Sequence, residues 1–114
     1  MLDELQFRDR ADEAISRLQR ALEQASDRHD FEVDNNQGAL AIEFDDPPAK
    51  FIVSPNSPVR QIWVSARVQS FKLDWDESRA AFVLPAGGRT ESRTLQQLIA
   101  GVVSEQLGEE VVLP

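Results

Sequence analysis

Cysteine is absent from this 114-residue chain, and His29 is its only histidine. The lack of thiols excludes a disulfide framework, a thiolate nucleophile and the usual cysteine-ligated zinc site. A single imidazole argues against histidine-based metal sites and against a Ser-His-Asp arrangement. The Glu-x-x-His pattern of buried di-metal helix bundles is also missing. Carboxylate oxygens are therefore the candidate metal ligands.

Long apolar runs are missing too. No stretch approaches the roughly 20 apolar residues that span a bilayer, and the charged residues 1–13 do not resemble a signal peptide. We therefore expect a cytoplasmic protein without a membrane partner. Hydrophobic residues nevertheless make up 41% of the chain, which is enough for a core. The length is that of one ordinary domain, so residues 1–114 are predicted to form a single domain.

Negative charge is concentrated in the first part of the chain. Residues 1–46 hold thirteen acidic and five basic side chains, which accounts for the whole net charge of −8, whereas residues 47–114 are neutral. An acidic half repels nucleic acid and attracts cations or a basic partner protein. A merely solubilising acidic surface would show the same distribution, so charge alone leaves both interpretations open.

Two segments have the apolar spacing of amphipathic helices. In the first, apolar residues recur every three or four positions from Ala11 to Ala25. Asp3 is its candidate N-cap, and the poor helix formers at 27–30 predict its end. The second helix is marked by Leu95, Leu98, Ile99, Val102 and Val103, with Gly108 as its C-terminal cap. The apolar tail 111–113 is expected to lie over the helix layer.

Six short segments between the helices have the composition of strands: 31–34, 39–44, 50–53, 61–66, 70–75 and 80–84. Clusters of Asn, Asp, Gly and Pro separate several of them and predict turns. This order predicts an α+β fold. We expect a two-layer α/β sandwich with two helices packed on one face of a mainly antiparallel sheet of about six strands. The other sheet face would be open to solvent or to a partner.

Trp63 is the candidate binding residue of that open face. It lies between Ile62 and Val64 and therefore points to the opposite side of the strand. If its two neighbours face the core, Trp63 is exposed, where a large aromatic side chain is often a binding anchor. The opposite register, with Trp63 buried, is the alternative. Trp75 shares a face with Phe71 and is predicted to belong to the core.

Asp9, Asp12 and Glu13 are neighbours on one side of the first predicted helix. Like charges at these spacings cost a few tenths of a kcal/mol per pair, which a fold tolerates without any function. Hard cations bind such exposed carboxylates weakly and with little selectivity. A glycosidase-like acid/base pair would need a deep pocket, which a domain of this size is not expected to provide.

The stretch SPNSPVRQIWVSA at 54–66 resembles the most specific signature of the frataxin family, Asn-x-Gln-x-Pro-x-x-Gln-Ile/Val-Trp, through Pro58, Gln61, Ile62 and Trp63. The strand GALAIEF at 38–44 and the stretch KLDW at 72–75 support the resemblance. The segment EQLGE at 105–109 is similar to the bacterial branch of the family. The similarity covers nearly the whole chain and implies the helix–sheet sandwich.

The resemblance also implies a function: an accessory or regulatory protein of iron–sulfur cluster assembly, not an enzyme, with ferroxidase activity as a distant alternative. An acidic ridge along the first helix and first strand would bind ferrous or ferric iron weakly at the surface. By position, that ridge comprises Asp12, Glu13, Glu23, Asp27, Asp30, Glu32 and Asp34.

The implied partners are a cysteine desulfurase and the scaffold protein. The sheet surface that contacts them would include Asn56, Gln61, Trp63 and Lys72. No nucleic-acid partner is expected, and the protein is expected to be a monomer, with oligomerisation in the presence of iron left open.

Several residues depart from the family pattern. Ser54 and Asn56 stand where the family usually has Asn and Gln, Lys72 stands where Arg is common, and Arg10 replaces a usual Leu. Helix positions that are often acidic hold Ser16, Arg20 and Gln24. The ridge is therefore diluted on the helix. The alternative function is an adaptor of the same machinery that has little useful iron binding.

Overall fold

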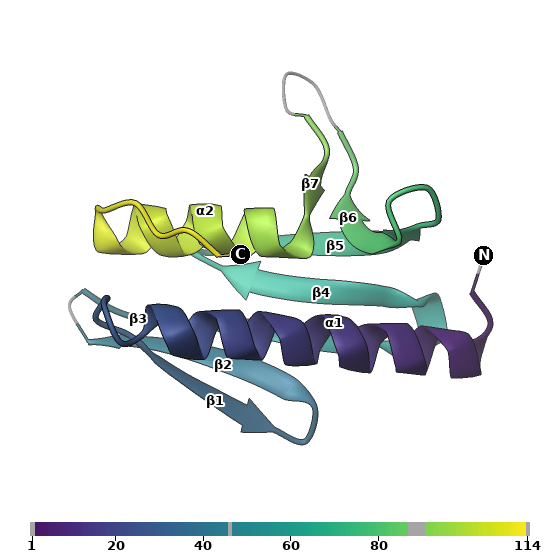
Figure 1. Ribbon diagram of the computed structural model, residues 1–114, viewed down its shortest axis with the longest axis horizontal. Helices are drawn as coiled ribbons and strands as arrows, with labels where there is room; N and C mark the ends of the chain where they lie inside the picture. The colour runs from purple at the N-terminus through teal and green to yellow at the C-terminus, as the bar shows by residue number, and fades with distance from the viewer. Residues whose placement is uncertain (1, 46, 87–90, 114) are drawn as a thin grey trace.

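The computed structural model describes residues 2–45, 47–86 and 91–113, which form two helices on one face of an antiparallel sheet (Figure 1). The sheet has seven strands in sequential order, so each strand pairs with its neighbours along the chain. The α+β sandwich with both helices on one face is thus confirmed. The elements in chain order are α1 (Glu4–Ala25), β1 (Glu32–Asn36), β2 (Ala39–Asp45), β3 (Pro48–Asn56), the short 3-10 helix η1 (Ser57–Val59), β4 (Gln61–Ala66), β5 (Gln69–Asp76), β6 (Ala81–Leu84), β7 (Arg93–Thr94) and α2 (Leu95–Leu107).

The predicted caps of both helices are confirmed. Asp3 begins α1 by accepting the Gln6 backbone N–H at 2.8 Å, and the Gln6 side chain accepts the Asp3 backbone N–H in return. This reciprocal pair satisfies two amides that the helix itself leaves unpaired. Gly108 ends α2 in the left-handed conformation with φ at 69°, and its N–H donates to the Ser104 carbonyl. That conformation suits glycine because it has no Cβ.

The core lies between the helices and the sheet. Leu18 and Leu22 of α1 and Leu98 and Val103 of α2 are fully buried there. They pack over the alternate strand residues that face them, such as Ile62. Trp75 lies on this helix-facing side, as predicted, but it is only half-buried.

Trp63 is 37% exposed, whereas its neighbours Ile62 and Val64 are 0% and 1% exposed. The register that places Trp63 on the open face is therefore confirmed, and the buried alternative is wrong. Because successive strand residues alternate between faces, this one assignment orients the whole of β4.

The number of strands and most of the strand boundaries differ from the prediction, β1 and β3 by the most. The additional strand, β7, has only two residues, Arg93 and Thr94. Such a segment is too short to show a period of two, so its pairing with β6 could not be anticipated. β1 continues to Asn36 because its turn needs only Gln37 and Gly38, both with positive φ.

β3 is longer than the predicted segment 50–53. It includes Pro48, expected to end the preceding strand, and Pro55, expected to lie in the turn that follows the segment. Pro48 is its first residue, a position at which a strand tolerates the missing N–H. Pairing with β2 spans Pro48 to Val53, and pairing with β4 carries β3 on to Asn56, which lies opposite Gln61. Long-range pairing thus overrides the local turn propensity of this stretch.

The C-terminal tail lies along α2, as predicted (Figure 1). Val111 is 3% exposed, and its N–H donates to the Ser104 hydroxyl at 2.9 Å. Leu113 packs against the core from outside. In the part of the chain that the structure describes, neither helix is apolar enough over a sufficient length to cross a membrane.

Candidate functional site

The open face of the sheet brings together the four residues predicted to bind a partner. Asn56 of β3 pairs with Gln61 of β4, and Trp63 of β4 pairs with Lys72 of β5. Residues directly opposite each other in an antiparallel pair project to the same face. All four side chains therefore share the face that the helices leave uncovered.

Gln61 and Lys72 both contact Trp63, and Gln61 also contacts Asp74. The Trp63 indole N–H donates to Gln61 Oε1 at 3.0 Å, and Gln61 Nε2 donates to Asp74 Oδ1 at 3.0 Å. Lys72 Nζ lies 5.0 Å from the centroid of the Trp63 ring, a cation–π arrangement. We call Gln61, Trp63, Lys72 and Asp74 the Trp63 network. It holds the indole by its edge and by its face, so the exposed aromatic ring is pre-oriented.

Asp74 was not among the predicted site residues. The sequence marks it only as the start of a stretch that faintly resembles a calcium loop but lacks the required glycine at the sixth position. A usable signal was present in the period of two, because Asp74 follows Lys72 on the same face of β5. Its pairing with Gln61, however, depends on the β4–β5 register.

A depression of about 210 Å³ lies beside the Trp63 ring. Its lining includes Ile52, Ser54, Ser65 and Ser70 from three adjacent strands. The three serines are small, so they leave one side of the Trp63 ring open to the depression. An exposed aromatic side chain next to a hollow can pack against a side chain of a partner that enters the hollow. Asn56 makes no hydrogen bond to the Trp63 network within the described residues.

The seven predicted metal ligands are all exposed, but they lie on different parts of the molecule. Three are on α1, two lie in the connection to β1, and two are on β1: Asp12, Glu13, Glu23, Asp27, Asp30, Glu32 and Asp34.

The register of β1 divides this ridge. Val33 pairs with the buried Ile42 and faces the helices, so Glu32 and Asp34 project to the open face. Contact between α1 and β1 is made by other residues, including the Asn35 amide, which donates to Gln19 at 2.9 Å. The acids of β1 and those of α1 are therefore on opposite sides of the sheet and approach each other only around its edge.

Glu13 has a partner of its own, because Arg17 Nη2 lies 3.1 Å from Glu13 Oε1. Across residues 2–45, 47–86 and 91–113, no three His, Asp or Glu side chains come together as a group that could hold a metal ion. Carboxylate oxygens suit hard cations chemically. Their separation here leaves room only for an ion held by one or two carboxylates and water, which is a weak and unselective mode of binding.

Negative charge on the open face is concentrated along β1 and β2, whereas Lys72 and Asp74 balance each other beside Trp63. β1 and β2 contribute Glu32, Asp34 and Glu43, and Glu43 pairs with Lys50 on β3. Lys72 on β5 supplies a second cation beside Trp63. A partner surface that is basic opposite the β1–β2 edge and apolar opposite Trp63 would be complementary to this pattern.

Comparison with known proteins agrees with this fold. The family described as "Frataxin-like domain" matches residues 1–109. The chain therefore belongs to the frataxin-like family, and the bacterial resemblance seen in the sequence is confirmed. A solved frataxin from Psychromonas ingrahamii has the same fold, with a TM-score of 0.80 over 97% of each chain, although only 18% of residues are identical.

Two relatives are more similar in sequence. A protein of Azotobacter vinelandii named "Iron-sulfur cluster assembly protein CyaY" is 35% identical over 104 residues, which cover 90% of each chain. One of the same name from Dechloromonas aromatica is 32% identical over 112 residues, which cover 98% of this chain and 99% of that one. In both comparisons the similarity covers nearly the full length of this chain and of the relative.

Proposed function

We propose that this protein is an accessory protein of iron–sulfur cluster assembly that acts by docking rather than by catalysis. Its partners are a cysteine desulfurase and the scaffold protein on which the cluster forms. The names of the relatives support a role in iron–sulfur cluster assembly. The Trp63 network, which holds an exposed aromatic ring ready on an uncovered sheet face, is the observation that carries the docking.

Pre-orientation matters because binding normally costs the entropy of ordering side chains at the interface. Trp63 is already fixed by Gln61 and Lys72, so a partner that covers it gains buried apolar area with little ordering cost. Tryptophan is among the residues most often found as an energetic hot spot. The acidic β1–β2 edge would act earlier, by steering a basic partner to the correct side of the sheet.

Iron binding is the second part of the proposal. Ferrous or ferric iron would bind weakly to the exposed carboxylates, without a chelating cluster. An anaerobic ferrous titration followed by NMR should broaden amides near Asp12, Glu13, Asp30 and Glu32 first. The effect should weaken with salt, because exposed charges are screened beyond about 10 Å at 0.1 M. Gel filtration with and without iron tests the accompanying expectation of a monomer, and cell fractionation tests the expectation of a cytoplasmic protein.

A specific observation favours the adaptor without useful iron binding as the alternative. Glu13 already has a cation at 3.1 Å, and the acids of α1 and β1 occupy opposite sides of the sheet. No broadening at the named amides, or broadening confined to His29, would select the adaptor.

Surface-based binding kinetics against purified desulfurase, alone and with its scaffold, test the docking. Trp63→Ala should raise the dissociation rate about 30-fold, because a buried aromatic anchor typically contributes about 2 kcal/mol or more. Leu5→Ala is the matched control, since Leu5 is 69% exposed on α1, away from the open face. Equal effects of both variants would contradict docking through Trp63.

Charge reversal tests the steering. Asp30→Lys combined with Glu32→Lys should slow association and flatten its salt dependence. The control is Glu105→Lys combined with Glu110→Lys, which makes the same charge change near the end of α2. If both pairs act alike, only the net charge matters. If neither acts at low salt, the acidic half serves solubility alone.

A further inference from the structure

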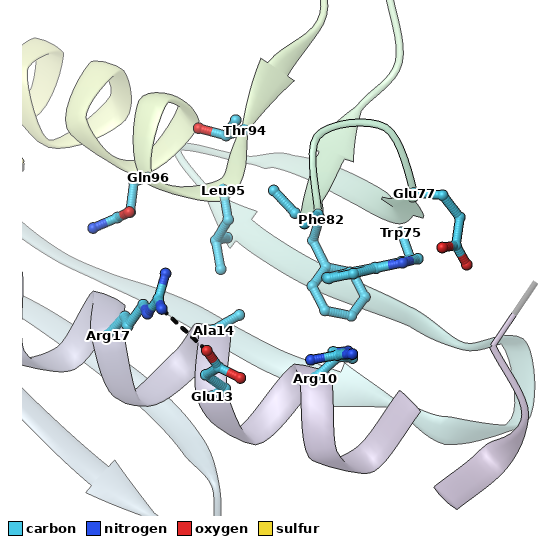
Figure 2. A pocket seen from close by; sticks show the side chains of 12 residues that line it. Arg10, Glu13, Ala14, Arg17, Trp75, Glu77, Phe82, Thr94, Leu95 and Gln96 are labelled. Atoms are coloured by element: carbon cyan, nitrogen blue, oxygen red, sulfur yellow. Dashed lines mark ion pairs between the residues drawn. The ribbon is translucent and has the colours of Figure 1, made fainter. Parts of the chain in front are cut away.

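A second depression lies in the helix layer, on the side of the molecule away from the open face (Figure 2). It has a volume of about 370 Å³ and is bounded by α1, the start of α2 and the turn between β5 and β6. Ala14, Phe82 and Leu95 contribute its apolar lining. We call it the inter-helix groove. Its volume is near the lower limit of small-molecule sites, which are typically about 300–1,000 Å³.

Arg10 stands at one end of the groove without a carboxylate partner among the described residues. Its guanidinium carbon lies 5.5 Å from the centroid of the Trp75 ring. The other two arginines on this part of α1 are paired: Arg8 with Glu4 at 3.0 Å and Arg17 with Glu13 at 3.1 Å. Stacking on the ring orients the Arg10 guanidinium but uses none of its N–H donors, which remain open to a planar acceptor.

The Trp75 ring forms the wall of the groove beside Arg10. Trp75 Nε1 is buried and has no hydrogen-bond partner in the described structure. The Trp75 ring is held edge-to-face against Phe82, with their centroids 5.2 Å apart. The Trp75 N–H lies at the end of the ring near Glu77 (Figure 2), so a ligand in the groove would meet the ring and not this donor.

The start of α2 adds partial positive charge at the same groove. Thr94, its N-cap, lines the groove, and the first turn of α2 holds no acidic residue to offset the helix dipole. Two carboxylates in the lining, Glu13 and Glu77, oppose this positive charge. Glu13 is engaged by Arg17, which leaves Glu77 as the carboxylate of the lining without an ion-pair partner among the described residues. This balance suits a ligand with one negative charge better than a dianion.

We propose that the inter-helix groove binds a small organic monocarboxylate with a flat apolar body. The carboxylate pairs with the Arg10 guanidinium, and the apolar body lies against Phe82, Ala14 and Leu95. The groove and the open face carry different tryptophans, so this site is independent of docking through Trp63. A ligand of about ten heavy atoms in so shallow a site should bind with a dissociation constant of about 1–10 mM.

An NMR titration of the ¹⁵N-labelled protein with sodium phenylacetate, to about 20 mM at constant ionic strength, tests the proposal. Phenylacetate should shift the amides of Ala14, Ala81 and Leu95 and the Trp75 indole N–H. The Trp63 indole resonance, assigned with Trp63→Phe, should stay in place. No shift at the groove by about 20 mM, or an equal shift of both indoles, would overturn the proposal.

Two arginine variants test the carboxylate contact. Arg10→Gln should weaken phenylacetate binding about tenfold, because it removes the charged, bidentate donor. Arg8→Gln makes the same charge change on the same helix and should leave binding unchanged. An equal loss in both variants would show that only general electrostatics attract the probe, and no loss in Arg10→Gln would remove Arg10 from the site.

Other probes and a filled groove test the rest of the chemistry. Phenylacetamide, the neutral analogue, and inorganic phosphate, which lacks an apolar body, should each act about tenfold more weakly than phenylacetate. Ala14→Leu should abolish the shifts by occupying the groove while retaining Arg10. Binding of phenylacetamide or phosphate as tight as that of phenylacetate would overturn the proposed ligand class, as would undiminished binding to Ala14→Leu.

Discussion

Gln61 links the exposed indole of Trp63 to the carboxylate of Asp74, accepting from one and donating to the other at 3.0 Å each. The Gln61 carboxamide can do both at once, because it has an acceptor oxygen and a donor nitrogen on the same carbon. Gln61 and Trp63 are two residues apart on β4, so they lie side by side on one face. The orientation of Trp63 therefore depends on a neighbour that need not touch the partner at all.

Gln61→Leu should weaken docking on the desulfurase–scaffold complex about fivefold, less than Trp63→Ala, because the indole remains but loses its orientation. Stability should change by less than about 1 kcal/mol, since both hydrogen bonds are at the surface. Gln69→Leu is the matched control, as Gln69 is an exposed glutamine at the far end of β5. A double-mutant cycle of Gln61 with Trp63 should be non-additive. Strict additivity would mean that the two residues act independently.

Leu18→Ala should lower the free energy of unfolding by about 2–5 kcal/mol, because removing a fully buried leucine leaves a cavity under α1. Leu18 is 0% exposed, whereas Leu5 on the same helix is 69% exposed. Leu5→Ala is therefore the control and should cost little. Chemical denaturation measures both. A loss below about half a kcal/mol for Leu18→Ala would contradict its place in the core.

Val68 occupies the left-handed region with φ at 60° and its side chain is fully exposed at the β4–β5 turn. A β-branched residue is strained in that conformation, and no packing compensates here. Val68→Gly should therefore stabilise the protein by about 1 kcal/mol. Thermal unfolding beside Val59→Gly, a change at an exposed valine of η1, provides the comparison. A lower stability of Val68→Gly would show that the turn needs the valine.

Local chemistry explains which features could be predicted from the sequence. Asp3 and Gly108 cap their helices through contacts with residues three or four positions away. The exposure of Trp63 follows from the strict alternation with its two buried neighbours. These signals lie within one element, so no knowledge of the pairing was needed.

Long-range register explains what could not be predicted. The contact of Gln61 with Asp74 requires the alignment of β4 with β5. The placement of Glu32 on the open face requires the pairing of β1 with β2. The stacking of Arg10 on Trp75 joins residues 65 positions apart, on a helix and a strand. Each depends on the assembled fold, so composition and spacing could at most name the residues involved.

The stability that the turn between β5 and β6 contributes should depend on pH through Asp76. The Ser78 hydroxyl donates to Asp76 Oδ1 at 2.7 Å, and the Ser78 and Arg79 backbone N–H groups donate to the same oxygen. The Ser78 hydroxyl first, and then these amides and the Arg79 charge, lower the pKa of Asp76, outweighing the opposing effect of burial. A lowered pKa in the fold means that the ionised form is the stabilising one.

The stabilisation from Asp76 is therefore present above its unfolded pKa of about 3.9 and is lost as the pH falls through the lower folded value. Asp76→Asn should be less stable than wild type at pH 7, and the difference should shrink as the pH is lowered from about 5 toward 3. Ser78→Ala, which keeps both backbone donors, should show the same trend with smaller amplitude. Denaturation midpoints across this range measure it. A difference that grows on acidification would contradict the assigned direction.

The ion pair between Glu13 and Arg17 gives a direct test of iron binding on α1. Arg17 Nη2 lies 3.1 Å from Glu13 Oε1, and both side chains are more than half exposed. A metal ion that binds Glu13 must compete with this cation, although exposed pairs of this kind are weak. Arg17→Gln should therefore lower the ferrous concentration that broadens the Glu13 amide by about two- to threefold.

Arg8→Gln is the matched control for this experiment, because it removes one positive charge from the same helix but frees Glu4, which lies outside the predicted ridge. Under anaerobic conditions, Arg8→Gln should leave the broadening at Glu13 nearly unchanged, and manganese should compete with iron in both variants because carboxylates discriminate poorly among hard ions. Equal gains in both variants would indicate diffuse attraction by net charge. If iron broadens the amides of Asp30 and Glu32 but not that of Glu13 in either variant, iron binds at the β1 side of the divided ridge. If none of the three responds, the adaptor without iron is the correct function.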